Sequence, residues 1–407
     1  MARRGVGRKV KITDLRSALL GRNLVVRVVT DADICGYGAV EEGKEYVRAS
    51  FEMLAPFLIG QDPTQVERTM LRIRRLGAFK PWGKAVSAIE VALWDLAGKA
   101  AGLPVHRLLG GKVRERVRVY NTGWRVPSVD GLEPQHFAEN MRRLREAREG
   151  FTMVKAGMAL HGGSMVGHVP NFTYAEHRQG APHATRGPLT EQAMHHMVAC
   201  VAGMKEGLGD GVGLALDCGP GWTIPDAIRF ARAVEPFQLL WLEDLLTGDY
   251  VPYVNAAQYR EVTRSTSTPI HTGEQIYLRQ NFVELLSTQA VRVIGPDPFD
   301  VGGIAELKWV AELADLHGVL IAPHGVLDGL IGLAALVQVC ATLPDNFLAF
   351  EYPMGRPEWW YDIVTGLPDP IVTDGFITVG DSPGLGIEFD IDAASRHLRE
   401  EDRQFFS

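Results

Sequence analysis

Between Leu214 and Glu351 the sequence repeats one arrangement six times: a short apolar run leads to an acidic or imidazole side chain. The stretches are LALDCG (214–219), LLWLEDL (239–245), TPIHTGEQ (268–275), VRVIGPDPFDVGG (291–303), VLIAPHG (319–325) and FLAFEYP (347–353), and their functional groups are Asp217, Glu243, Glu274, Asp297, His324 and Glu351. Successive groups are 23 to 31 residues apart, and one strand–helix unit takes about 30 residues. The spacing therefore predicts one such unit for each functional group.

Three of these groups suggest a metal site. Any single carboxylate after an apolar run could be a turn former or a helix N-cap. In a barrel of parallel strands, however, the C-terminal ends of all strands face one cavity, so groups distant in sequence converge there. Asp217, Glu243 and Glu274 would then form an all-oxygen cluster whose mutual repulsion requires a cation. Oxygen ligands favour magnesium, manganese or calcium over zinc.

The patterns outside this region predict a second, smaller domain. Residues 9–50 alternate like a three-strand antiparallel meander, and helical periods follow as far as Gly102. From Val113 onward strand and helix patterns alternate, which is typical of a parallel sheet. The chain of 407 residues leaves room for a further domain beside a barrel of about 250 residues. We expect an α+β domain at 1–114, a barrel at 115–368 and a C-terminal segment at 369–407 that returns to the first domain.

Charge and composition restrict the partners. The chain is 46% hydrophobic and 22% charged, with a net charge of −7, so it lacks the basic field that nucleic acid or an anionic membrane requires. No apolar run approaches the length of about 18 residues that a membrane span needs. The four cysteines form no CxxC pair, and the basic N-terminus lacks the apolar core of a signal peptide. We expect a cytoplasmic enzyme that acts on a small molecule.

A polar insertion at 159–189 interrupts the barrel pattern. It is far longer than an ordinary connection of about 2–6 residues, and it follows the C-terminal end of a strand, which would place it over the barrel mouth. Two interpretations stay open: a lid that contacts substrate, or a loop that supports a neighbouring subunit. The lid interpretation assigns substrate contacts to Tyr174 and His177, among further candidates His161, His168, Arg178 and His183.

These motifs together resemble the enolase superfamily, and within it the mandelate racemase-like subgroup. The resemblance covers nearly the whole chain, including ALWDLAGKAAGLPVHRLLGG (92–111), the carboxylate series, the Asp297 and His324 pair and the PGLGIE ending. It implies a (β/α)7β barrel closed by a capping domain from both termini, with Mg²⁺ as cofactor. It also implies removal of a proton alpha to a carboxylate as the first step. From its segment ICGYGAVEEG, a predicted turn, the capping domain would contribute Tyr37 to substrate binding.

The catalytic roles follow from that chemistry. A proton alpha to a carboxylate is very weakly acidic, so its removal needs a fixed cation and a base whose pKa is near neutral. His324 suits the base, with Asp297 orienting the imidazole. The resemblance implies that Glu351 is an acid near the second substrate oxygen, and that Lys155 neutralises the substrate carboxylate.

The chain departs from the subgroup at two positions. Racemases of the subgroup carry Lys-x-Lys on the second barrel strand, whereas this chain has Lys155-Ala156-Gly157. Related acid-sugar dehydratases often place a histidine two residues after the first metal ligand, where this chain has Gly219. A glycine cannot exchange a proton, so both a second base and the usual acid are missing from these positions.

Three hypotheses remain from the sequence. The leading one is a Mg²⁺-dependent dehydratase that converts an acid sugar to a 2-keto-3-deoxy acid. The second is a racemase or epimerase of a carboxylic or amino acid, and the third is a catalytically lapsed barrel with a binding or regulatory role. We also expect a homo-oligomer, as is common in the family.

Overall fold

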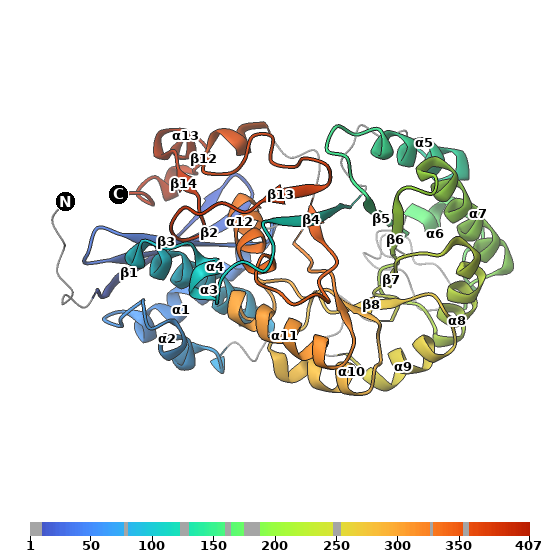
Figure 1. The fold of residues 1–407 in the computed structure, drawn as a ribbon, viewed down its shortest axis with the longest axis horizontal. Coiled ribbons are helices and arrows are strands. Elements are labelled where there is room, and N and C mark those ends of the chain that lie inside the picture. Colours follow the sequence, from blue (N-terminus) through green and yellow to red (C-terminus); the bar gives the residue numbers. More distant parts are fainter. Residues whose placement is uncertain are drawn as a thin grey trace.

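The computed structural model describes residues 10–76, 80–122, 130–158, 164–174, 188–246, 254–325, 329–352 and 358–407. Figure 1 shows a barrel of parallel strands with helices outside it on one side of the molecule, and a smaller domain on the other.

Eight parallel strands form the barrel. They follow one another in the sheet in chain order, and the last, β11, pairs with the first, β4. A parallel bridge from Ile321 to Phe347, just before β11, joins β10 to the β11 segment, so the sheet is closed. The strands are β4 (Arg116–Asn121), β5 (Met153–Gly157), β6 (Gly213–Asp217), β7 (Leu242–Glu243), β8 (Ile270–Thr272), β9 (Val293–Ile294), β10 (Leu320–Ile321) and β11 (Phe350–Tyr352).

Helices cover the outside of this sheet, as expected for parallel strands whose faces are both buried. Local signals set where several of them begin: the Thr190 and Thr223 hydroxyls accept the Ala193 and Asp226 N–H groups at the starts of α7 and α8. The helices are α5 (Pro134–Arg145), α6 (Ser164–His168), α7 (Glu191–Leu208), α8 (Ile224–Ala233), α9 (Ala256–Arg264), α10 (Val283–Ser287), α11 (Ile304–Leu316) and α12 (Gly329–Cys340), with 3₁₀ turns η3 (Glu235–Phe237) and η4 (Arg279–Phe282).

The capping domain begins with a meander of antiparallel strands, β1 (Ile12–Leu20), β2 (Asn23–Thr30) and β3 (Cys35–Val40), as predicted. Its longest helix, α3, is nearly all buried where its side chains are described, and it packs on β3. Gly36 and Gly38 allow this approach, because a Cβ at either position would lie 1.9 Å from a carbonyl oxygen of α3. The helices are η1 (Glu45–Val47), α1 (Arg48–Leu58), α2 (Val66–Ile73), α3 (Lys80–Ala101) and α4 (Val105–Leu108).

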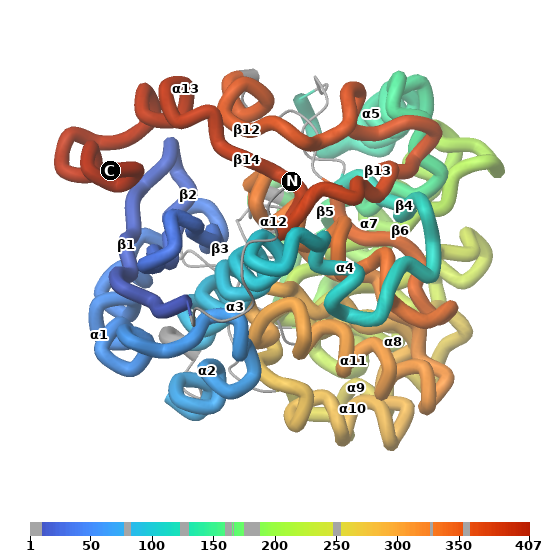
Figure 2. The backbone as a smooth tube through the Cα atoms, turned by 60° about the vertical axis from the view of Figure 1, so that its left-hand side comes forward, coloured from blue at the N-terminus to red at the C-terminus, as the bar shows by residue number. Residues whose placement is uncertain are grey.

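The C-terminal segment returns to the capping domain, and Figure 2 shows it running from the barrel to β1 and β2. Arg48 of α1 forms a bidentate ion pair with Asp402, at 2.7 and 2.8 Å, and Leu398 bridges to Leu20 of β1. The elements of this segment are η5 (Glu358–Asp362), β12 (Val364–Thr365), β13 (Phe376–Thr378), β14 (Glu388–Phe389), α13 (Ile391–Ser395) and η6 (Glu400–Asp402). The fold class predicted from the sequence is confirmed, while the residue boundaries of its domains stay predictions.

A buried carboxylate of the capping domain accepts hydrogen bonds from the first residues of a barrel helix. Glu90 of α3 accepts the backbone N–H groups of Ile304 and Ala305, at 2.7 and 3.0 Å, and so caps α11 from a distant part of the chain. Gly303, at φ +110°, makes room, because a Cβ there would lie 2.0 Å from Glu90 Oε2. Burial raises the pKa of Glu90 to about 8, although these N–H groups favour its ionised form.

A buried lysine forms a second connection between the domains. Lys84 Nζ of α3 lies 2.6 Å from Asp300 Oδ2 of the barrel and 3.1 Å from Glu41 Oε2 of the capping domain. Burial raises the pKa of Asp300 to about 6 against the pull of Lys84. Because Asp300 is three residues after Asp297, this contact supports the loop that carries a predicted catalytic residue.

Candidate active site

The six predicted groups stand at the C-terminal ends of six successive barrel strands. Strand pairing brings neighbours together, since Asp217 is in register with Glu243, and Glu243 with His271. The groups are Asp217 and Glu243 as the last residues of β6 and β7, Glu274 two residues after β8, Asp297 and His324 three residues after β9 and β10, and Glu351 within β11. Lys155 extends from β5 toward the same centre.

His324 and Asp297 form a closely held pair. His324 Nδ1 lies 2.7 Å from Asp297 Oδ2, and the other oxygen of Asp297 accepts the Phe299 N–H at 2.6 Å. The carboxylate is thereby fixed on one side by backbone and aimed at the imidazole on the other. A carboxylate at Nδ1 leaves Nε2 as the nitrogen that can exchange a proton with a bound molecule.

Two more carboxylates lie near the other nitrogen of His324. Its Nε2 is 3.5 Å from Glu274 Oε2 and 3.4 Å from Glu351 Oε2. Burial alone would lower the pKa of His324, but the negative charges of Glu274, Glu351 and Asp297 outweigh it and raise the pKa well above its usual range. These negative charges therefore favour the protonated imidazole.

Lys155 is paired within the site. Its Nζ lies 2.6 Å from Glu243 Oε1 and 3.0 Å from Glu351 Oε1, and the lysine is buried. Burial works against both charges, yet their attraction holds the pKa of Lys155 well above its usual range and that of Glu243 at about 2. Lys155 is consequently an ammonium ion that offers charge, and it is unsuited to be a base.

Trp241 and His271 both contact Glu243 Oε2, and the sequence analysis predicted neither of them as a site residue. Trp241 Nε1–H donates to Glu243 Oε2 at 3.0 Å, and His271 Nδ1 lies 3.4 Å from the same oxygen. The two rings stack at a centroid separation of 5.3 Å. Burial lowers the pKa of His271 to about 4, so this imidazole is neutral. The alternation of side chains along β7 and β8 is the signal that could have placed them inside the barrel.

The donor set fits a divalent cation. Asp217, Glu243, Glu274, Asp297 and Glu351 bring five carboxylates to the site, whereas the cations named above are Lys155 and protonated His324. Glu243, Asp297 and Glu351 are buried, and Asp217 and Glu274 are partly buried, so this excess of negative charge favours a further cation. Asp217, Glu243 and Glu274 come from consecutive strand ends and offer only oxygen, which is the ligand type that hard divalent cations prefer.

Not every predicted substrate contact lies at this site. ICGYGAVEEG is mostly strand β3 and not a turn, and Gly36 and Gly38 in it serve close packing on α3. The Tyr37 ring is buried against the C-terminal segment, with centroids 4.8 to 6.4 Å from Phe389, Phe405 and Phe406. Its hydroxyl contacts the Cys35 sulfur, so the side chain is part of the capping-domain core, and this placement does not support the predicted role of Tyr37 in substrate binding.

The insertion is described only in part. Tyr174 is 73% exposed, and its backbone N–H donates to the Pro188 carbonyl across the base of the insertion. His168, a further candidate, lies instead beside Glu133. His177, with His161, Arg178 and His183, lies outside the described residues, so its predicted role stays a prediction.

The closed barrel, the capping domain and the ring of strand-end carboxylates define an enzyme of the enolase superfamily. Residues 15–110 match the mandelate racemase/muconate lactonizing enzyme N-terminal domain, and residues 135–394 match the enolase C-terminal domain-like family. The chain belongs to the mandelate racemase/muconate lactonizing enzyme family, as the sequence motifs indicated. Membership indicates a divalent metal and a small-molecule acid as substrate.

Several relatives cover almost the full chain. A D-xylonate dehydratase from Haloferax volcanii is 34% identical over 410 residues, covering 99% of this chain and 92% of the relative. A D-galactonate dehydratase family member from Streptomyces bingchenggensis is 32% identical, covering 92% of this chain and 90% of the relative. Among solved structures, a mandelate racemase/muconate lactonizing enzyme-like protein from Rubrobacter xylanophilus superposes with a TM-score of 0.82 at 33% identity, covering 97% and 99% of the two chains.

Proposed function

We propose that this enzyme dehydrates an acid sugar to a 2-keto-3-deoxy acid, with a five- or six-carbon aldonic acid as the first substrate class to test. Two observations carry the proposal: among the described residues of the central site, His324 is the imidazole oriented by a carboxylate, Asp297 at 2.7 Å, and position 157 is a glycine. A racemase needs a base on each face of the substrate, whereas a dehydratase can begin with one. The names of the relatives, D-xylonate and D-galactonate dehydratase, support the same reaction class.

Each residue has a proposed role in this reaction. His324, once neutral, takes the alpha proton at Nε2 while Asp297 holds Nδ1. The electron pair of the broken C–H bond moves into the substrate, and the beta hydroxyl departs. The proton on His324 can leave with that hydroxyl as water, which balances the elimination. The resulting enol then becomes the 2-keto acid by ordinary tautomerisation.

The remaining charges stabilise the substrate carboxylate as electron density accumulates on it. Lys155 is proposed to neutralise the substrate carboxylate, Glu351 to donate a proton to its second oxygen as an acid, and Asp217, Glu243 and Glu274 to hold Mg²⁺. When bound, Mg²⁺ supplies positive charge that stabilises the developing dianion. Because Glu274 lies 3.5 Å from His324 Nε2, engagement of Glu274 by a cation would weaken its pull on the imidazole and help to free the base.

We also propose a cytoplasmic homo-oligomer in which Tyr174 and His177 of the insertion contact substrate. All four cysteines are free, which agrees with a reducing compartment. No helix among the described residues is long and apolar enough to cross a membrane. Analytical ultracentrifugation that finds only monomer at micromolar concentration would contradict the oligomer.

The reaction can be tested with a panel of aldonic and uronic acids. Protein and Mg²⁺ are incubated with each acid, and 2-keto products are trapped with semicarbazide. We expect turnover of at least one acid by the native chain and by a His195→Asn control, and none by His324→Asn. Proton NMR in heavy water separates the alternative, because an epimerase introduces deuterium at the alpha carbon without a keto product. Absence of both product and exchange across the panel would overturn the proposal.

A further inference from the structure

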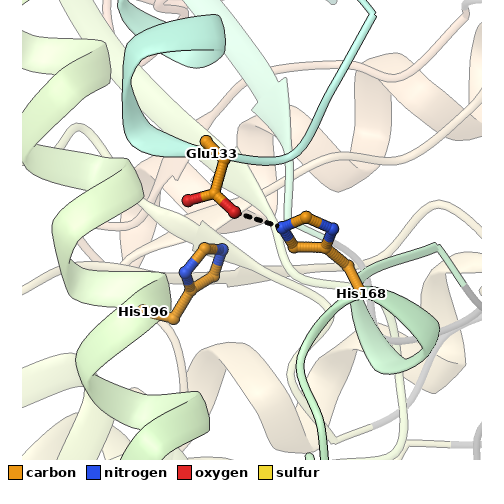
Figure 3. A group of neighbouring side chains, drawn as sticks. All are labelled: Glu133, His168 and His196. Carbon is orange, nitrogen blue, oxygen red and sulfur yellow. Dashed lines mark hydrogen bonds and ion pairs between the residues drawn. The ribbon is translucent and has the colours of Figure 1, made fainter.

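A cluster of metal-ligating side chains lies at the rim of the barrel, apart from the carboxylates described above. Glu133, His168 and His196 each offer one ligand atom, and these atoms all lie within 4.8 Å of one another. Figure 3 shows the three side chains pointing toward one another from three different segments. Glu133 immediately precedes α5, His168 ends α6 of the insertion and His196 lies in the first half of α7.

The contacts in this cluster are those of a built site. His168 Nε2 lies 2.7 Å from Glu133 Oε1, and the two imidazole centroids are 5.4 Å apart. Glu133 is itself held in place, because its side chain accepts a backbone N–H from the first turn of α5. The Leu132 carbonyl oxygen lies 2.8 Å from His196 Nε2, and by accepting the ring N–H it would orient this imidazole.

The donor types select a different metal from the one at the barrel centre. Two imidazoles and one carboxylate are typical of zinc, and of neighbouring late first-row metals, whereas magnesium prefers oxygen alone. Three protein donors would leave the fourth position of a tetrahedral zinc site for water. His168 is one-third exposed, so an ion can enter from solvent.

We propose that Glu133, His168 and His196 bind a zinc-type divalent cation that fastens the insertion to the barrel. The α5 and α7 helices pack against each other beside this point, and α6 is attached to them through His168. Without a metal, a partly exposed histidine–carboxylate pair contributes little to stability. A bound cation would therefore hold α6 against the neighbouring helices more firmly than the ion pair alone. The proposal does not depend on the reaction assigned to the central site.

Metal binding can be measured on the full chain in excess Mg²⁺, which occupies oxygen-rich sites. Chelator-treated protein is dialysed against Zn²⁺ and the bound metal is counted, while Co²⁺ gives the visible absorption of a nitrogen-containing tetrahedral site. We expect one Zn²⁺ per chain in the native protein and in Glu243→Gln, which alters the central site. His168→Ala and His196→Ala should each lose it. His195→Ala is the matched control, because this exposed histidine adjoins His196 outside the cluster.

Hydrogen exchange gives a readout that does not rely on metal counting. Zn²⁺ should slow amide exchange in residues 164–168 of the native chain and of His195→Ala, but not of His168→Ala. Circular dichroism of each variant verifies that the barrel is folded. Zinc binding that survives in both His168→Ala and His196→Ala, or that is lost in Glu243→Gln instead, would overturn the proposal. So would loss of binding in His195→Ala to the same extent as in His196→Ala.

Discussion

His324 Nδ1 lies 2.7 Å from Asp297 Oδ2, and Asp297 is itself fixed by the Phe299 N–H, so the imidazole is oriented by a carboxylate that has no freedom to turn. Mutation can distinguish the two roles proposed for this pair, which are proton exchange at His324 and positioning of its imidazole by Asp297.

His324→Asn should abolish exchange of the substrate alpha proton and leave Mg²⁺ affinity nearly unchanged, because the imidazole is not a proposed metal ligand. Asp297→Asn should lower kcat less, by at most about 10⁴, the loss seen when an aspartate beside a catalytic histidine becomes asparagine. Deuterium exchange by NMR and calorimetric titration with Mg²⁺ measure the two effects. Wild-type exchange in His324→Asn would mean that the base lies elsewhere.

The main effect of Glu243→Gln should be weaker binding of Mg²⁺. The substitution removes a proposed ligand and also the partner of Lys155 at 2.6 Å, so its effect should exceed the roughly 10–100-fold loss that follows from altering an outer partner of a metal ligand. Isothermal titration with Mg²⁺ gives the affinity. Asp244→Asn is the control, since this neighbouring buried carboxylate accepts the Thr272 hydroxyl; equal weakening in both variants would argue against Glu243 as a ligand.

Lys84→Met should destabilise the folded chain by roughly 3–5 kcal/mol, because Asp300 and Glu41 would keep buried charges without their cation. The same change at the ion-paired Lys112, whose partners Glu115 and Asp381 are exposed, should cost at most about 1 kcal/mol. Urea unfolding monitored by tryptophan fluorescence compares them. A similar midpoint for the two variants would show that Lys84 contributes no more than a surface pair.

Glu90 predicts a pH dependence of stability. Its pKa is about 8 in the folded chain and about 4.3 when unfolded, so between these values the unfolded state binds fewer protons. Stability should therefore be greatest near pH 4 from this group, and fall by up to about 1.4 kcal/mol per pH unit as pH rises toward 8. Glu90→Gln should flatten that part of the profile, as measured by unfolding midpoints from pH 5 to 8. An unchanged slope would contradict the raised pKa.

The sequence predicted the barrel and the members of its central site because both depend on chain order. Strand ends in a closed parallel sheet meet whatever their side chains are, so the spacing from Asp217 to Glu351 was sufficient. Pairings within the site depend instead on side-chain direction over a few ångströms. For that reason the sequence suggested Lys155 for substrate but gave no sign that it bonds Glu243 and Glu351, or that Trp241 and His271 lie under Glu243.

The position of the Tyr37 side chain differs for a related reason from what the sequence suggested. Glycines beside a tyrosine resemble a flexible loop in sequence, but here they remove the side chains that would keep β3 away from α3. Glycine serves both close packing and chain flexibility, and only the surrounding structure shows which of the two applies. The Glu90 cap on α11 was hidden likewise, since its partners are more than 200 residues away.

The Glu90 cap limits how such enzymes can be recombined. This contact has two parts in different domains: the Glu90 carboxylate in the capping domain, and Gly303 with the amides of Ile304 and Ala305 in the barrel. A chimera that takes its capping domain from one relative and its barrel from another inherits the carboxylate from one parent and the glycine and amides from the other. Its success should depend less on overall identity than on whether a carboxylate of the right reach meets a glycine at the matching position. Crossover points in directed evolution should therefore be chosen to keep these two short segments from the same parent.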